Sequence, residues 1–454
     1  MTPIFEAPIP RNREAFLSRF AAKRLVSRNA PGKSWPNAGM AGTCRERVGK
    51  IARKRRNTMT KKINVAMIGQ GFMGRSHSNA WGQVQKFFDP ELMPVMHTVY
   101  GMETENPSSF AQKWGWRNAS TNWEETVRSP EIDLVDIVTP NFMHAPPAKA
   151  ALEAGKVCCC EKPISATLDD AREMAEAARK HGIPSFVWYI YRRCPAVAYA
   201  HELVKAGELG EILHVRASYL QGWADEKIPM RWRFKKELAG SGAHGDLNAH
   251  VTDMARFVAG VEVEEICGAI SKTFIKKRRV MQSGTGRMTI DQCEGTREEI
   301  WDDVTVDDAV LYLAKFSNGA IGSFEATRRA TGNKNTNGFE INGTKGSIKF
   351  CFDRANELEY YDARVPAGVQ GWTTILSTHG ADHPYVKNWW PDGHLIGYEH
   401  TFTNMAYDVL RVINGEEPIV PLATFEDAYQ TQRILEAALI SAEEKRFVKL
   451  DEVR

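Results

Sequence analysis

A mostly apolar run that ends in three spaced glycines limits most strongly what this chain can fold into. The run covers residues 63–68 and leads into Gly69, Gly71 and Gly74. This spacing predicts a buried strand that turns sharply into a helix, because glycine permits the tight turn and lets a pyrophosphate approach the helix N-terminus. Three spaced glycines also occur in many loops, so the flanking chain has to support the pattern.

Further apolar runs give that support. They predict four more strands, at residues 95–100, 132–138, 157–160 and 186–191. Helix signals alternate with these strands, and one helix begins with Thr167 as its N-cap and ends at Gly182. Because alternating strands and helices are typical of a parallel sheet, we expect a dinucleotide-binding α/β domain over residues 59–191.

The pattern changes beyond Pro195, where a helix is followed by a series of strands. We expect these strands at residues 212–220, 310–316, 320–326, 339–341 and 347–350. One side of the first of them carries Ile212, His214, Arg216 and Ser218. Ser317-Asn318-Gly319 suits a type I′ hairpin turn, the polar residues 273–304 suit a loop insertion, and residues 424–444 suit a helix. Residues 192–454 are therefore expected to form an α+β domain with a largely antiparallel sheet.

Charge separates the first 58 residues from the rest of the chain. Residues 1–58 contain 14 Lys or Arg and 3 Asp or Glu, whereas the whole chain has a formal net charge of only +3. The remainder is therefore acidic, which argues against nucleic acid as its partner. We expect residues 1–58 to be a basic extension that is disordered or follows from a mis-called start, with Met59 as the true start.

Two other interpretations of this extension stay open. Apolar positions among its arginines, at Phe16, Leu17, Phe20 and Leu25, would suit an organelle presequence, and the basic cluster would suit a nucleic-acid-binding arm. No apolar run in the chain is long enough to span a bilayer, so no membrane partner is expected. Eight cysteines at irregular spacings form neither a disulfide frame nor a zinc pattern. The run 158–160 suits buried packing, and a cytoplasmic location is expected.

Lys162 is the first candidate for chemistry. It follows the predicted strand 157–160, at the end where ligands bind on open α/β sheets. A lone lysine there would be an ordinary surface residue. Its place between Glu161 and Pro163, beside the expected nicotinamide site, instead favours a proton donor or an anchor for a carbinol oxygen.

Asp246 and His250 form the second candidate group. They are four residues apart, so on a helix they share a face that differs from the packed one. A helix cap beside an ordinary buried histidine is the plainer alternative, and a metal pair ranks low because no third ligand is evident. We therefore expect no metal. Trp232 and Arg233 suit either the core or a substrate-pocket rim, and the stretch around Trp389 suits either a sugar face or a subunit contact.

Together these motifs resemble the Gfo/Idh/MocA oxidoreductases, the relatives of glucose–fructose oxidoreductase and inositol dehydrogenase. The resemblance covers residues 59–454 and rests on residues 69–74 with His77, Thr139-Pro140-Asn141 with His144, Glu161-Lys162-Pro163, and Asp246 with His250. It implies a Rossmann domain followed by an open-faced, mainly antiparallel sheet. It also implies hydride transfer between a nicotinamide cofactor and a hydroxyl carbon of a sugar, glycoside, anhydrosugar or cyclitol.

The resemblance also implies roles for single residues. His250 would take the hydroxyl proton, Lys162 would hold the oxygen, and Asp246 would orient the sugar. The implied cofactor-binding residues are Gly69, Gly71, Phe72, Met73, Gly74, Thr139, Asn141, His144, Glu161 and Lys162. The implied substrate-binding residues are Lys162, Trp232, Arg233, Asp246 and His250. A homo-oligomer, either a dimer or a tetramer through the open sheet face, is expected as well.

One departure from the family pattern concerns the cofactor. Relatives often place an Asp after the second strand to hold the ribose hydroxyls, but this chain has Gly101 there, with Glu103 as a substitute. No adjacent Arg or Lys could hold a 2′-phosphate, so NAD is favoured and NADP is the alternative. Two other classes of function stay open: a non-catalytic nicotinamide-binding sensor on the same fold, and a metal-dependent hydrolase or isomerase.

Overall fold

The computed structural model describes residues 61–281, 300–380 and 383–454. The chain divides into the unit Met1–Met59 and the compact unit Thr60–Arg454. The predicted basic extension thus lies outside the described residues, as does the middle of the predicted insertion at 273–304. Within the described ranges, no helix is long and apolar enough to cross a membrane.

The first sheet is parallel and has six strands in the order β3-β2-β1-β4-β5-β6. The strands are β1 (Lys61–Ile68), β2 (Leu92–Tyr100), β3 (Asn118–Ser120), β4 (Leu134–Ile137), β5 (Val157–Cys160) and β6 (Ser185–Val187). The strand order reverses between β1 and β4. In sheets of this kind, a crevice opens at that point beyond the carboxyl ends of the strands, and ligands bind there. This is the predicted Rossmann arrangement.

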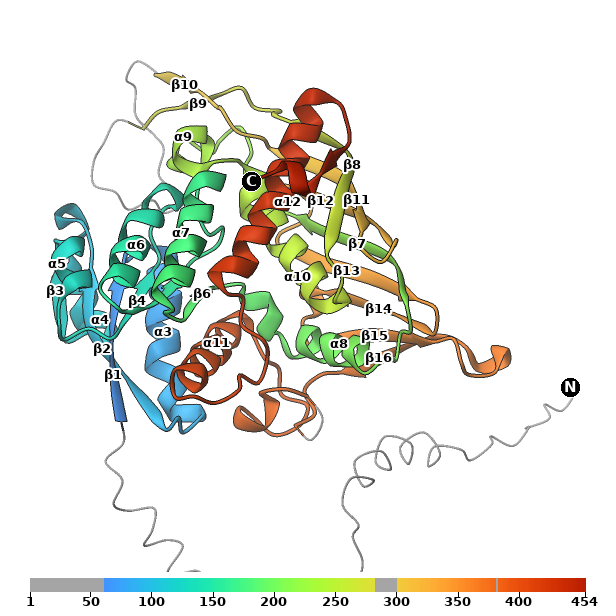
Figure 1. The fold of residues 1–454 in the computed structure, drawn as a ribbon, viewed down its shortest axis with the longest axis horizontal. Coiled ribbons are helices and arrows are strands. Elements are labelled where there is room, and N and C mark those ends of the chain that lie inside the picture. Colours follow the sequence, from blue (N-terminus) through green and yellow to red (C-terminus); the bar gives the residue numbers. More distant parts are fainter. Residues whose placement is uncertain (1–60, 282–299, 381–382) are drawn as a thin grey trace, which may run out of the picture. The chain divides into compact units, whose positions relative to one another are not determined.

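Helices cover both faces of this sheet (Figure 1). The helices of this half are α3 (Phe72–Phe87), α4 (Pro107–Trp114), α5 (Trp123–Arg128), α6 (Ala145–Glu153) and α7 (Leu168–His181). Alternate strand residues serve the two sides: Val65 and Cys159 pack in the core with α3, whereas Ala66 and Cys160 pack in the core with α6 and α7. Strands buried on both faces explain why the sequence runs here are continuously apolar.

The second sheet has nine strands in the order β16-β15-β14-β13-β7-β12-β11-β8-β17. They are β7 (Ile212–Leu220), β8 (Val263–Lys272), β11 (Ala309–Phe316), β12 (Ile321–Thr327), β13 (Thr336–Gly343), β14 (Gly346–Cys351), β15 (Glu357–Asp362), β16 (Trp372–Leu376) and β17 (Val448–Lys449). Only the β7–β12 pair is parallel among these described strands, so the sheet is mainly antiparallel, as predicted.

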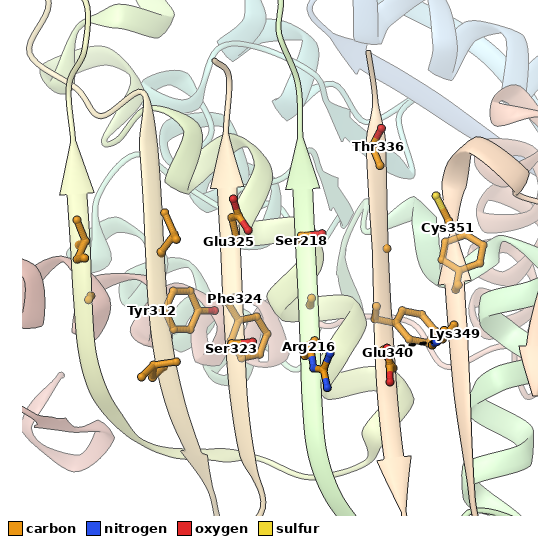
Figure 2. Close-up of a pocket in the computed structure, with 18 of the residues that line it drawn as sticks. Arg216, Ser218, Tyr312, Ser323, Phe324, Glu325, Thr336, Glu340, Lys349 and Cys351 are labelled. Carbon is orange, nitrogen blue, oxygen red and sulfur yellow. Dashed lines mark ion pairs between the residues drawn. The ribbon is translucent and has the colours of Figure 1, made fainter. Parts of the chain in front are cut away.

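One face of the second sheet is covered and the other is open. The helices of this half are α8 (Pro195–Lys205), α9 (Lys236–Ala239), α10 (Ala249–Ala259), α11 (Tyr398–Ile413) and α12 (Phe425–Glu444). Of these, α8, α10 and α12 contact the sheet (Figure 1). The opposite face carries Arg216, Ser218, Glu325, Glu340 and Lys349 around a broad pocket (Figure 2).

Several helix ends and one buried run lie where the sequence predicted them. The hydroxyl of Thr167 accepts a hydrogen bond from the backbone N–H of Asp170 at 3.1 Å, and Gly182 ends α7 in the left-handed conformation. Thr424 caps α12 in the same way. The run 158–160 is buried, as predicted.

Four predictions need correction. The strand expected at 186–191 ends at Val187, because the chain turns to bury Trp188 and then forms a short 3₁₀ helix at Ile190–Arg193. The predicted insertion contains two short paired strands, β9 (Lys277–Arg279) and β10 (Trp301–Asp303). On β7, Ile212 is buried although Arg216 and Ser218 face the open side, and a register shift lies at that end of the strand.

The fourth correction concerns the hairpin between β11 and β12. The hairpin itself is present, but its turn is not type I′, because only Gly319 has a positive φ, of 86°, while Asn318 does not. The N–H of Gly319 donates to the carbonyl of Phe316 at 2.9 Å, which closes a three-residue loop. Such loops place a left-handed glycine last, so Gly319 alone meets the requirement.

Candidate active site

The glycine turn after β1 has the shape that a dinucleotide needs. Gly69 has a φ of 114°, and a Cβ on Gly74 would lie 3.0 Å from the carbonyl oxygen of Gly69. A Cβ on Gly71 would meet nothing within 4 Å, so the space above it is open. The first turn of α3 has no acidic residue and no side-chain cap, which leaves its N–H groups available. These features fit the pyrophosphate of NAD.

A cavity of about 790 Å³ lies next to this turn, between the carboxyl edge of the first sheet and the second sheet. Its lining includes most of the predicted site residues, namely Phe72, Met73, Thr139, Asn141, Glu161, Lys162, Trp232, Arg233, Asp246 and His250. The glycines at 69, 71 and 74 form the adjoining turn. Residues that are far apart in the sequence therefore meet in one place.

Asp246 is the electrostatic centre of this cavity. Its carboxylate accepts a hydrogen bond from Lys162 Nζ at 2.9 Å and another from Arg328 Nη2 at 3.0 Å, and it lies 3.5 Å from Arg233 Nη1. Burial acts to raise the pKa of Asp246, but these three cations outweigh burial and hold the pKa well below its usual value. Asp246 is thus ionised and fixes the Lys162 ammonium group in the cavity.

A short π-helical segment presents this carboxylate. Residues His244–Asn248 form a π-helical turn that continues directly into α10, where His250 lies. Asp307 anchors its start by accepting hydrogen bonds from the N–H of Gly242 and of His244, each at 2.9 Å. A side chain at Gly242 would collide with the Asp307 backbone, so glycine is needed for this approach. Such π-turns occur often at functional sites.

His250 is buried and neutral. Its ring lies edge-on to Tyr191, with the ring centres 4.7 Å apart, and close to Tyr219 at 5.9 Å. Burial lowers the pKa of His250 well below its usual value, and the Lys162 ammonium acts in the same direction. Its Nδ1 is buried and makes no hydrogen bond within the described residues, so Nε2 is the nitrogen left to meet a substrate. A neutral imidazole there can accept a proton.

A second charged network lies next to Lys162, around the neighbouring residue Glu161. His77 bridges two carboxylates: its Nδ1 lies 2.8 Å from Asp136 and its Nε2 lies 3.0 Å from Glu161. Asp136 also accepts hydrogen bonds from the indoles of Trp81 and Trp188, both at 2.8 Å. Burial acts to lower the pKa of His77, but the two carboxylates outweigh it and raise the pKa to about 9. His77 is therefore a buried imidazolium that positions Glu161.

Some predicted residues lie elsewhere. His144 does not line the cavity but is buried, with its ring nitrogens 3.0 Å from the carbonyl of Pro163 and 2.9 Å from that of Thr139. It braces the two loops that carry Thr139 and Lys162. Trp389 is buried against Phe87 with the ring centres 4.4 Å apart, whereas its neighbour Trp390 is 43% exposed.

Sequence reasoning missed three residues that shape the cavity: Arg328, Tyr191 and Tyr219. Arg328 is almost fully buried, and its position two residues after the predicted strand 320–326 was the one available signal. The hydroxyls of Tyr191 and Tyr219 lie 2.8 Å apart, and that of Tyr219 donates to Asn335 at 2.7 Å. They line the cavity beside His250.

The expected adenosine end has an unusual arrangement. The Gln70 side chain lies over Gly101, where a Cβ would come within 2.6 Å of it, and its amide donates to the carbonyl of Glu105 at 2.8 Å. A 3₁₀ turn at Glu103–Glu105 follows. Both carboxylates of this turn are exposed, and that of Glu105 accepts from the N–H of Met102 at 3.0 Å.

Two family models match the chain in the order that this fold requires. The model described as an oxidoreductase family with an NAD-binding Rossmann fold matches residues 63–189. The model of the GFO/IDH/MocA C-terminal domain matches residues 197–349. The first match covers nearly all of the six-stranded sheet, and the second covers β7, β8, β11 to β13 and part of β14 of the nine-stranded sheet.

Individual proteins agree with the family models. A levoglucosan dehydrogenase of Pseudarthrobacter phenanthrenivorans is 38% identical over 397 residues, covering 87% of this chain and 99% of that protein. The crystal structure of an oxidoreductase domain protein from Kribbella flavida is 40% identical with a TM-score of 0.79, covering 86% of this chain and 99% of its own. A levoglucosan dehydrogenase solved with NADH and levoglucosan is 37% identical with a TM-score of 0.78 and the same coverage. The chain therefore belongs to the Gfo/Idh/MocA family of oxidoreductases and carries that family's NAD-binding Rossmann fold.

Proposed function

We propose that Lys162, Asp246 and His250 carry the chemistry of this NAD-dependent oxidoreductase, and that it acts on a secondary hydroxyl of a sugar or anhydrosugar. The carrying observation is the meeting of the three side chains in one cavity beside the glycine turn. Levoglucosan dehydrogenase, which is similar over almost its full length, supports an anhydrosugar-like substrate, and glycosides and cyclitols are related candidates.

In the oxidation, His250 accepts the proton of the substrate hydroxyl on Nε2 as the O–H bond breaks. Lys162 donates a hydrogen bond to the developing alkoxide, and Asp246 holds the ammonium group in position for this. When bound, NAD supplies the acceptor for the hydride that leaves the carbinol carbon. The products are a ketone, the reduced cofactor and a protonated His250, which balances atoms and charge. General acid–base assistance of this kind typically contributes about 10²–10⁴-fold.

The residues for NAD follow from the same geometry. The glycine turn at 69–74 would hold the pyrophosphate. Thr139, Asn141 and Glu161 line the cavity at the carboxyl ends of β4 and β5, where the nicotinamide is expected.

A substrate screen tests this proposal. Purified protein is incubated with NAD and a panel that contains levoglucosan, other anhydrosugars, free sugars, sugar acids, sugar phosphates and inositols, and the absorbance of the reduced cofactor is followed. We expect NADH to form with at least one of them. Tight NADH binding with no turnover of any panel member would instead favour the non-catalytic sensor, and metal-dependent conversion of a panel member without NADH formation would favour the hydrolase or isomerase.

We further propose a boundary between two domains, residues 59–191 and 192–454, which the family models at 63–189 and 197–349 support. A cytoplasmic location is proposed with the support of six described cysteines that are free thiols. The role of residues 1–58 stays a prediction.

The open face of the second sheet supports a homo-oligomer, with a second copy of this chain as its occupant (Figure 2). Its strands expose four large apolar side chains: Ile270 is 68% exposed, Leu311 42%, Leu313 54% and Ile321 60%. Exposed apolar patches on this scale mark interaction sites. The nearby ion pair between Lys349 and Glu340, at 3.7 Å, could add polar contacts at the same face.

A further inference from the structure

The substrate end of the cavity carries more positive charge than its catalytic role requires. Its lining includes Lys162, Arg231, Arg233 and Lys334, and Arg328 lies directly behind Asp246. The acidic side chains in the lining are Asp246 and Glu161. Glu161 already pairs with His77. Asp246 is therefore the one carboxylate of the described lining that is left for the five cations.

The Asp246 carboxylate does not neutralise all of this positive charge. Asp246 contacts Lys162, Arg328 and Arg233, whereas Arg231 and Lys334 have no carboxylate partner within the described ranges. Other acceptors in the lining are also engaged by the protein. Gln221 Oε1 accepts from the indole of Trp223, and Asn335 Oδ1 accepts from Tyr219 and Gln221, each at 2.7 Å. These two amide oxygens are therefore already engaged within the protein, whereas Arg231 and Lys334 are left without a carboxylate in the part of the chain that the structure describes.

Arg231 shows this imbalance most clearly. Its Nε is buried and makes no hydrogen bond in the described part of the chain. Burial lowers the pKa of Arg231, and the neighbouring Arg233 acts in the same direction. Leaving a guanidinium partly desolvated and unpaired costs free energy, which an anion would offset. The guanidinium of Arg233 lies over the ring of Trp232, 4.4 Å from the ring centre.

A neutral sugar fits this end of the cavity less well than an anion. Each hydroxyl group of a neutral sugar brings a donor that needs an acceptor, and the amide oxygens of Gln221 and Asn335 are already engaged. A carboxylate or phosphate is acceptor-only and matches the forked donors of arginine. The phosphates of NAD have their own expected place on the glycine turn, so they do not explain these cations.

We propose that the sugar substrate carries an anionic group, a carboxylate or a phosphate, and that Arg231, Arg233 and Lys334 bind it. This proposal rests on the proposed function, because it concerns the substrate of the same cavity. It narrows the substrate class from sugars in general to sugar acids or sugar phosphates. Carboxylate and phosphate share the chemistry that the three cations recognise.

The test compares matched sugars by binding rather than by turnover. D-Glucose, D-glucuronate and D-glucose 6-phosphate are titrated calorimetrically into the protein saturated with NADH. We expect at least one anionic sugar to bind tenfold or more tightly than glucose, and its affinity to fall as salt is added. The preferred anion separates the two sources: preference for glucuronate indicates sugar acids, and preference for the phosphate ester indicates sugar phosphates.

Variants then locate the effect. Arg231→Met should lower the affinity for the preferred anionic sugar by about 10- to 100-fold. Arg231→Lys should recover part of this affinity, and Lys334→Met should lower it less than Arg231→Met does. Lys227→Met is the matched control, because it removes the same charge from an exposed position outside the cavity lining. It should leave the affinity for the anion unchanged.

Several results would overturn the proposal. These are equal affinity for glucose and the anions, no measurable anion binding, or equal losses in Arg231→Met and Lys227→Met. A loss of NADH affinity without a loss of anion affinity in Arg231→Met would instead assign the cations to the cofactor. Failure of the proposed function looks different, since an anionic sugar would then bind as expected but form no NADH when NAD is supplied.

Discussion

Lys162 and Asp246 are 84 residues apart in the sequence, yet their side chains form a partly buried ion pair of 2.9 Å. Lys162 follows a strand of the first sheet, and Asp246 lies in the π-helical turn that leads into α10. The pair therefore joins the first sheet to the second half of the chain across the cavity. A shift between the two halves of the chain would separate the groups on which the proposed reaction depends.

The first prediction concerns catalysis. We expect Lys162→Ala and His250→Ala each to lower kcat by about 10²–10⁴-fold, because each removes a group that handles the hydroxyl proton or the alkoxide. The glycine turn is untouched, so NADH binding, followed by fluorescence titration, should persist. Near-normal turnover in both variants would remove Lys162 and His250 from the mechanism.

The second prediction concerns Arg328. Its guanidinium is buried against Asp246 and also donates to the carbonyl of Arg233 at 3.3 Å. Breaking a buried pair leaves an uncompensated charge, so Arg328→Met should lower the free energy of unfolding by about 3 kcal/mol. The matched control is Arg329→Met, whose partner Glu226 is 72% exposed and whose loss should cost less than about 1 kcal/mol. Urea unfolding measures both, and equal losses would contradict the role given to Arg328.

The third prediction concerns cofactor choice. The region after β2 offers Glu103 for ribose hydroxyls and, among its described neighbours in sequence, no cation for a 2′-phosphate. We expect kcat/KM to favour NAD over NADP by roughly tenfold, a difference of about 1.4 kcal/mol. Glu103→Ala should narrow the ratio. A strong preference for NADP in steady-state assays would mean that the loop around Gly101 and Gln70 binds the cofactor differently.

The fourth prediction concerns His77 and pH. Its pKa of about 9 in the folded chain lies above the ordinary value of 6.5, so protonation stabilises the folded state. This contribution is complete below about pH 6.5 and is lost as the pH rises through 9. A shift of this size corresponds to a few kcal/mol. His77→Gln should therefore be less stable than the parent at pH 6, and the difference in unfolding free energy should shrink toward pH 10. A difference that does not vary with pH would show that His77 is not charged.

The fifth prediction concerns assembly. Leu313→Arg places a charge on β11, at the open face of the second sheet. We expect this variant to sediment as a smaller species than the parent chain, because the apolar contact is lost. Leu395→Arg is the control, since Leu395 is 73% exposed but does not belong to that sheet. A monomeric parent chain, or equal behaviour of the two variants, would argue against this interface.

Elements with local signals were predictable from the sequence. The Thr167 cap, the Gly182 stop and the glycine turn depend on residues a few positions apart, and the structure has all three. On β7 the predicted alternation is present from Val215 to Leu220 but fails at Ile212, where a register shift lies. The π-helical turn was not predictable, because it depends on Asp307, which approaches Gly242 from 65 residues away.

The residues of the candidate site also divide into those that the sequence identified and those that it did not. Lys162, Asp246 and His250 stand in recognisable motifs, whereas Arg328 reaches Asp246 only after two distant segments pack together. The burial of Trp389 was not predictable, because its partner Phe87 belongs to a distant helix. Local sequence identifies the groups that can do chemistry, but tertiary packing decides which groups surround them.

Because the cysteine run on β5 is buried, modification of its thiols reports the opening of the first sheet. Burial raises the pKa of Cys158, Cys159 and Cys160, so a thiol reagent cannot modify them while the strand is paired. The two described cysteines that are partly accessible, Cys267 and Cys351, both belong to the second sheet, and Cys351 lines its open face (Figure 2). Alkylation followed by mass spectrometry would thus report two events separately: shielding of Cys351 by a second subunit, and simultaneous labelling of three thiols when the Rossmann sheet unravels.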